Sequence, residues 1–276
     1  MKIIPVFIIT QLLFLVAGAQ NVGIGTTSPQ ASLHVAQGSV VFTSTGAIPT
    51  TAGNIPVSGA GRRLLWYADK AAFRAGYISG TNWDQTFIGS YSFATGYDTK
   101  ASGIASTALG DFTIASGSVS TAMGYHTTAS GSVAIAMGSN TTASGSGSTA
   151  IGNISTASGD YSTALGYLTG AIGDNSSALG YNTKASGDNS TAMGNFTTAS
   201  GDNSTAIGNY VTSNSKPGSF IIGDDGVTAT PSQLFGNDAD NQMMMRFEGG
   251  YKLYSKGWGF AIGAELLPGN TSWSAM

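Results

Sequence analysis

Glycine occupies every seventh position of this chain from Gly89 to Gly208 without interruption. The heptads alternate between sequences close to STALG and sequences close to TxASG, so the true period is fourteen residues. A coiled coil also repeats every seven residues, but it needs two apolar positions per heptad among helix-forming residues. Glycine, serine and threonine dominate here, and each glycine costs about 1 kcal/mol in a helix. The period therefore predicts short strands joined by glycine corners, two strands to a coil, in a parallel β-solenoid.

Equivalent residues of successive coils should stack about 4.8 Å apart, the spacing of paired strands. Two columns then become ladders. One is Ala108, Ala122, Ala136, Ala150, Ala164, Ala178, Ala192 and Ala206, and the next is Leu109, Met123, Met137, Ile151, Leu165, Leu179, Met193 and Ile207. Neighbouring strand residues point to opposite faces, so a narrow coil can bury only one of these columns. The other would be an exposed apolar stripe, which predicts side-by-side association of coils. Which column faces the interior remains open at this point.

The composition excludes several functions. The chain has no cysteine, which removes disulfides and thiol chemistry. Only 9% of the residues are charged and the net charge is −3, so no electrostatic footprint for a nucleic acid is present. The two histidines, His34 and His126, are far apart and lack neighbouring carboxylates. We therefore expect no catalytic residue, no cofactor and no metal site, because such sites need convergent groups.

Three polar or aromatic columns are candidates for a binding surface. The first contains Thr127, Thr141, Thr183 and Thr197, the second contains Asp160, Asp174, Asp188 and Asp202, and the third contributes Tyr167 and Tyr181 in adjoining coils. Stacked carboxylates could recruit Ca²⁺, although aspartate is also a common, solvated turn residue. Threonine arrays resemble those of ice-binding proteins, although threonine is also a favourable strand residue.

One motif of the repeats resembles that of a known family. Residues 148–159 read STAIGNISTASG, and this pattern of Ser-x-Ala-Ile/Leu-Gly-x-x-Ser/Thr-x-Ala-x-Gly recurs through the repeats. It resembles the head repeats of YadA-like trimeric autotransporter adhesins. The resemblance implies a left-handed parallel β-roll, a homotrimer and a location on the bacterial outer surface, with attachment to an extracellular protein, glycan or surface.

The flanks differ from the repeat. Residues 1–19 combine a lysine, a short apolar run and Ala17-Gly18-Ala19, which predicts a secretory signal peptide. We expect a β segment and linker over 20–61, a β cap over 62–88, the β-roll over 89–212 and a C-terminal β region over 213–276. The flanks resemble the β-rich segments of bacterial surface proteins and phage tail-fibre-like proteins. Because no heptad stalk precedes Met276, we expect another means of attachment or a longer product.

The sequence thus predicts an all-β, exported, non-enzymatic adhesin head that forms a homotrimer and does not insert into the membrane after signal removal. Two alternatives stay open. The roll could be a structural shaft or spacer of a fibre whose binding tips lie elsewhere, or an ice-binding solenoid that depends on Thr127, Thr141 and Thr183.

Overall fold

The computed structural model describes residues 21–224, 234–256, 262–266 and 274–275, and the predicted signal peptide lies outside them. The chain divides into two units, Met1–Thr45 and Gly46–Met276. In the described part of the first unit, strand β1 (Val22–Ile24) pairs in parallel with β2 (Leu33–Val35). No helix in the described part of the chain is long and apolar enough to cross a bilayer.

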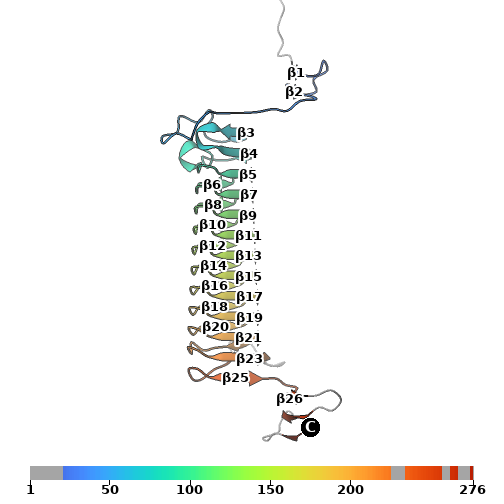
Figure 1. The fold of residues 1–276 in the computed structure, drawn as a ribbon, viewed down its shortest axis with the longest axis vertical. Helices are drawn as coiled ribbons and strands as arrows, with labels where there is room; N and C mark the ends of the chain where they lie inside the picture. Colours follow the sequence, from blue (N-terminus) through green and yellow to red (C-terminus); the bar gives the residue numbers. More distant parts are fainter. Residues whose placement is uncertain (1–20, 225–233, 257–261, 267–273, 276) are drawn as a thin grey trace, which may run out of the picture. The chain divides into compact units, whose positions relative to one another are not determined.

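The second unit contains a parallel β-solenoid of fourteen-residue coils, as the glycine period predicts. Each coil has one long and one short strand (Figure 1). The long strands are β5 (Phe93–Tyr97), β7 (Thr107–Asp111), β9 (Thr121–Tyr125), β11 (Ile135–Ser139), β13 (Thr149–Asn153), β15 (Thr163–Tyr167), β17 (Ser177–Tyr181), β19 (Thr191–Asn195) and β21 (Thr205–Asn209). The short strands are β6 (Lys100–Ala101), β8 (Ile114–Ala115), β10 (Thr128–Ala129), β12 (Thr142–Ala143), β14 (Thr156–Ala157), β16 (Gly170–Ala171), β18 (Lys184–Ala185), β20 (Thr198–Ala199) and β22 (Val211–Thr212).

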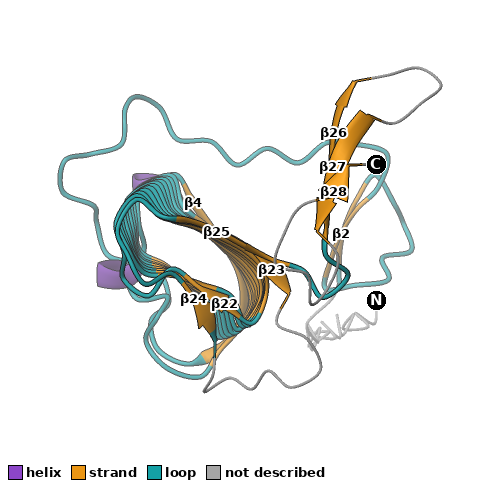
Figure 2. Ribbon diagram, turned by 90° about the horizontal axis from the view of Figure 1, so that it is seen from below, coloured by secondary structure: helices purple, strands orange, loops and turns teal. Residues whose placement is uncertain are grey.

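Every repeat strand pairs with its equivalent in the next coil, so identical residues lie directly opposite one another. Ala150 of β13, for example, pairs with Ala164 of β15, and Gly152 pairs with Gly166. Figure 2, a view along the stack, shows the long strands forming one layer and the short strands a second layer facing it. The coil interior lies between these two layers.

The interior holds only small side chains. Both alanine columns are fully buried, and they are represented in one coil by Ala150 on the long strand and Ala157 on the short strand. Leu/Met/Ile side chains of the next column point outward, which assigns the two columns that the sequence left open. Serine completes the interior, and in several coils its hydroxyl is paired: Ser162 Oγ donates to the carbonyl oxygen of Gly159 at 2.6 Å, whereas the hydroxyls of Ser148, Ser176 and Ser190 have no partner among the described residues. A buried hydroxyl without such a partner would cost free energy.

Two glycine columns allow the coils to stack. A Cβ atom built on Gly152 would lie 2.0 Å from the carbonyl oxygen of Gly166, and one on Gly159 would lie 2.0 Å from that of Gly173. Gly152 also has a φ of +125°, a backbone conformation that L side chains rarely adopt. These positions explain why the glycine period has no interruption.

An antiparallel hairpin of β3 (Gly61–Tyr67) and β4 (Ala72–Ile78) precedes the first coil, with the 3-10 turn η1 (Ala68–Lys70) between its strands. Strand β4 pairs in parallel with β5 and places Arg74 opposite Ala94, in the position of the interior alanine. Arg74 is fully buried, and its guanidinium donates to Phe73 O, Ser92 O, Ser92 Oγ and Ala101 O. Burial lowers the pKa of Arg74 to about 10. A cation thus satisfies backbone carbonyls where the ladder of coils begins.

A second residue closes the same end of the coil interior. Trp83 precedes the turn η2 (Gln85–Phe87), is fully buried, and donates from Nε1 to the carbonyl oxygen of Thr99 at 2.8 Å. An indole ring therefore covers the interior at the first coil. The edge of β5, which would otherwise be unpaired, is hydrogen-bonded to β4, and this prevents edge-to-edge association with another chain.

The ladder continues beyond the regular repeat. Strand β23 (Phe220–Asp224) pairs with β21 at an offset of fifteen residues, as in Thr205↔Phe220, and so adds a further coil strand that is out of phase with the repeat. Strand β24 (Phe235–Gly236) then pairs with β22, and β25 (Met243–Arg246) pairs with β23. Strands β26 (Tyr251–Lys256), β27 (Ile262–Leu266) and β28 (Ser274–Ala275) form a separate antiparallel sheet.

Candidate binding surfaces of the repeat

The threonine column lies inside the coil. Thr127, Thr141 and Thr197 are fully buried and Thr183 is 1% exposed, so these side chains do not form the outer ladder that the sequence suggested. The reason is local: the residue before each threonine has a positive φ, as at His126, and both the threonine and the second residue of the following two-residue strand, such as Ala129, then point inward. The hydroxyl of Thr197 donates to the carbonyl oxygen of Gly208 at 2.7 Å. An ice-binding face cannot be built from Thr127, Thr141 and Thr183 in this fold.

The aspartate column lies on the surface at a turn between coils. One carboxylate oxygen of each residue accepts a backbone N–H of the preceding coil: Asp174 accepts from Asp160 at 2.8 Å, Asp188 from Asp174 at 2.9 Å, and Asp202 from Asp188 at 3.0 Å. Asp160 accepts in the same way from Ser146 at 2.8 Å. These bonds continue the ladder at a turn, where the backbone carbonyls do not supply a partner. They give the column a structural role that is independent of any cation.

Tyr167 and Tyr181 lie at the ends of their strands and are 40% and 46% exposed. Their rings stack with centroids 5.2 Å apart and an interplanar angle of 17°. Phe196 and Tyr210 extend the row, with centroids 4.9 Å apart. The rings cover one another's faces, so the row presents ring edges and hydroxyl groups to solvent. It is a rigid, amphipathic stripe of the kind that is enriched at protein interfaces.

A second aromatic row lies nearer the N-terminal end of the solenoid, and the sequence reasoning missed it. Tyr77 stacks on Tyr97 at 5.4 Å, Tyr97 contacts Phe112 edge-on, and Phe112 stacks on His126 at 4.8 Å. His126 has a φ of +50°. Because the aromatic residues alternate between two adjacent columns, a search along either column alone does not reveal the row.

The outer apolar column, formed by Leu109, Met123, Met137, Ile151, Leu165, Leu179, Met193 and Ile207, runs along the outer face of the long strands. Leu165 is 43% exposed and Met193 is 42% exposed, and the other members are partly buried by their neighbours in the column. The column continues through Ile222 of β23 and Met245 of β25. A continuous apolar stripe of this kind on the surface of a chain marks an interaction face.

Within the residues that the structure describes, no three His, Cys, Asp or Glu side chains come together in an arrangement that could hold a metal ion. Nδ1 of His34 accepts a hydrogen bond from the backbone N–H of Gln30 at 3.2 Å.

The repeat region matches a known family. The model of the YadA head domain repeat (2 copies) matches residues 88–113, 115–141, 143–169, 171–197 and 185–210. These matches cover the regular coils and stop where the insertions begin. Comparison with curated proteins finds no match.

Proposed function

Because residues 88–210 form a YadA-like head domain, we propose that the chain is an exported, non-enzymatic adhesin head on the bacterial surface. The function would be attachment to an extracellular protein, glycan or other surface. The observation that supports this most is the surface itself: the in-register coils display the same polar and aromatic groups at each step, including Tyr167, Tyr181 and the aspartate column. Such repetition favours many weak contacts over one deep site.

The proposal includes a homotrimer in which the outer apolar column faces the partner subunits. Fully burying a leucine or methionine contributes about 1.5–3 kcal/mol, so covering the exposed two fifths of Leu165 or Met193 contributes about 1 kcal/mol each. Repeated along the column, this stabilisation favours association of the chains. The polar short-strand face would remain outward and free to bind.

Sedimentation velocity of the mature chain tests the trimer. We expect a single trimeric species for the wild type and a shift to monomer for Leu165→Asp combined with Met193→Asp. Thr142→Asp, on the outer face of the short strands, is the matched control and should leave the trimer intact. A wild-type chain that sediments as a monomer while retaining a β-rich circular dichroism spectrum would refute this part of the proposal.

Deletion of residues 107–134, which removes two complete coils and rejoins the ladder in register, tests the adhesive function. If the surface binds through its repeated groups, the shortened head should adhere to a cell-matrix or bacterial-target surface more weakly than the full chain. Unchanged adhesion would show that these two coils serve only as a spacer.

A further inference from the structure

The repeat is interrupted at β16, on the outer face of the short strands. In this column the neighbouring coils carry Thr156 and Lys184, which pair with Gly170 on either side. Two residues after Gly170, Ile172 occupies a column that contains serine in the other regular coils, as in Ser158. Both departures lie in one coil and on one surface.

Nothing in the backbone requires a glycine at Gly170. A Cβ atom there would lie 3.9 Å from the Ile172 side chain and 4.0 Å from Cγ of Lys184, which are ordinary contacts, and its φ lies outside the left-handed region. The glycines of the repeat period behave differently, since a Cβ on Gly152 would overlap a carbonyl oxygen. Glycine weakens a strand interior, and where no bend requires it, it often marks the close approach of another molecule.

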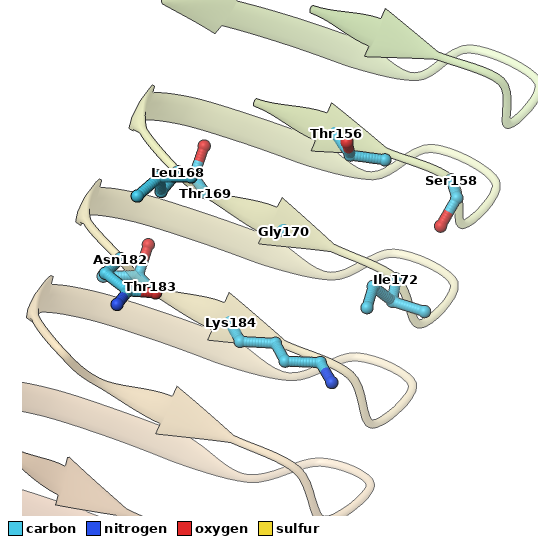
Figure 3. Close-up of a pocket in the computed structure, with 9 residues that line it drawn as sticks. All are labelled: Thr156, Ser158, Leu168, Thr169, Gly170, Ile172, Asn182, Thr183 and Lys184. Atoms are coloured by element: carbon cyan, nitrogen blue, oxygen red, sulfur yellow. The ribbon is translucent and has the colours of Figure 1, made fainter. Parts of the chain in front are cut away.

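A hollow of about 350 Å³ lies over Gly170. Figure 3 shows bare Gly170 between Thr156 and Lys184, with Leu168 at one end of the short strand and Ile172 at the other. Asn182 lies beside Leu168, one coil further along. We call this feature the Gly170 hollow. Its volume is at the lower end of the range of about 300–1,000 Å³ that is typical of ligand pockets.

The chemistry of the walls is mixed and carries a positive charge. Leu168 and Ile172 are 37% and 45% exposed and supply apolar surface. Thr156 and Asn182 supply a hydroxyl and an amide, and Lys184 supplies an ammonium group. No carboxylate lines the hollow, and among the described residues no ion pair involves Lys184. The hollow is therefore an unpaired cation beside hydrogen-bonding groups, in a chain whose net charge is −3.

We propose that the Gly170 hollow binds one carboxylate-bearing sugar unit of a glycan. The carboxylate pairs with Nζ of Lys184, the sugar hydroxyls bond to Thr156 and Asn182, and an apolar C–H face of the ring packs against Ile172. A charge-assisted bond supplies strength and the hydroxyl and amide groups supply orientation. An acidic peptide could also pair with the cation, so a glutamate-rich peptide is the competing ligand in the test.

The site is on the face opposite to the outer apolar column, so the proposed trimer leaves it open to solvent. This inference rests on the proposed function in one respect: it gives the adhesive head a defined ligand locus, present once per chain. Three copies in a trimer would bind a clustered glycan by avidity, without further contacts.

Surface plasmon resonance of the mature chain provides the test. The probes are immobilised oligosaccharides that end in a carboxylated sugar, the same compounds with the carboxylate reduced to an alcohol, and a glutamate-rich peptide. We expect binding to the carboxylated probe alone, weakened by added salt. Gly170→Thr introduces the residue that the preceding coil carries at this position, Thr156, and narrows the hollow, so it should lower the affinity at least tenfold while the unfolding midpoint stays equal or rises.

Two further variants separate the charge from the shape. Lys184→Gln should lower the affinity about 10- to 150-fold, which corresponds to the contribution of about 1.5–3 kcal/mol that a hydrogen bond to a charged group makes. Thr198→Val, in the same column but outside the hollow, is the matched control and should bind as the wild type does. A gain of function is also expected: Ile114→Thr, His126→Leu, Thr128→Gly, Ser130→Ile and Thr142→Lys together rebuild the arrangement elsewhere and should double the number of bound sugars per chain.

Equal binding of the reduced probe, binding of the peptide alone, or wild-type affinity in Gly170→Thr would overturn this inference. These outcomes are distinct from a failure of the proposed function. A head that adheres to its target surface but binds no carboxylated sugar refutes only the glycan site, whereas a mature chain that adheres to no surface refutes the adhesin proposal.

Discussion

The same substitution should have opposite effects at two glycines of this solenoid. Gly152→Ala places a Cβ atom 2.0 Å from the carbonyl oxygen of Gly166, in a backbone with a φ of +125°. Gly170→Ala places one no closer than 3.9 Å to its neighbours, outside the left-handed region. Both glycines lie in paired strands of adjacent coils, Gly152 in the long strand β13 and Gly170 in the short strand β16.

The geometry sets the magnitudes. Relief of the overlap at Gly152 requires β13 and β15 to separate by about 1 Å, which stretches ladder bonds such as Thr149 N–H to Ser162 O, now 2.8 Å, beyond hydrogen-bonding distance. Two or three lost bonds cost about 1 kcal/mol each, and the unfavourable φ costs about 1–3 kcal/mol more. We expect Gly152→Ala to lower the free energy of unfolding by about 3–6 kcal/mol in total. Gly170→Ala should raise it by about 0.4–1 kcal/mol, because it restricts the unfolded chain.

Guanidinium chloride unfolding, followed by circular dichroism at one fixed protein concentration, measures both variants against the wild type. The concentration must be fixed because association adds to apparent stability. If the two variants shift the unfolding midpoint in the same direction, or if Gly152→Ala is neutral, the close approach of the coils is not what maintains the glycine period.

The remaining predictions concern three other positions and use the same unfolding assay. Val133 has a φ of +58°, a conformation that asparagine tolerates and a β-branched residue does not, so Val133→Asn should stabilise the chain by about 1 kcal/mol. The reciprocal variant Asn189→Val should destabilise the chain. A stabilising effect of both variants would contradict the reasoning. Asp188→Ala should cost about 1 kcal/mol through the lost acceptor of a backbone N–H, whereas Asp188→Asn keeps the acceptor, removes like-charge repulsion and should be neutral or stabilising at low salt. Arg74→Met should destabilise by about 1–3 kcal/mol because it leaves buried carbonyls without donors, while the exposed control Arg62→Met should have no effect; equal effects would argue against the role of Arg74 at the end of the ladder.

The glycine period was sufficient to predict the coil, its two strands and its in-register ladders, because backbone contact between coils excludes every other residue at those positions. Which columns point into the coil and which point outward could not be predicted from the residue types. Besides the glycine of the long strand, two residues per coil adopt a positive φ, and they include Phe112, Val119 and Ile154, whose identities do not indicate it. These turns rotate the short strand and place threonine inside. The interior of a regular coil is also too narrow for leucine, and this follows from the spacing of the two strand layers and not from the residue types.

Of the candidate surfaces, the tyrosine row could be predicted from the sequence, whereas the Gly170 hollow was missed. Tyr167 and Tyr181 were recognised because they recur in one column, and the structure places them on the surface. The Gly170 hollow was detectable in principle, since Gly170 and Ile172 are departures within otherwise regular columns. A search for what repeats passes over such departures, and a discrete site in a repetitive fold is more readily found among the exceptions.

The pairing of each coil with its two neighbours alone also bears on how such a gene can change. Duplication or loss of one coil's coding segment would lengthen or shorten the stack by a single rung and recreate the same junction, as between Ala150 and Ala164. Three consecutive coils carry the Gly170 hollow, so changes elsewhere would move it along the stack without altering its walls. The length of the stack and the ligand specificity of the hollow could then change independently of each other.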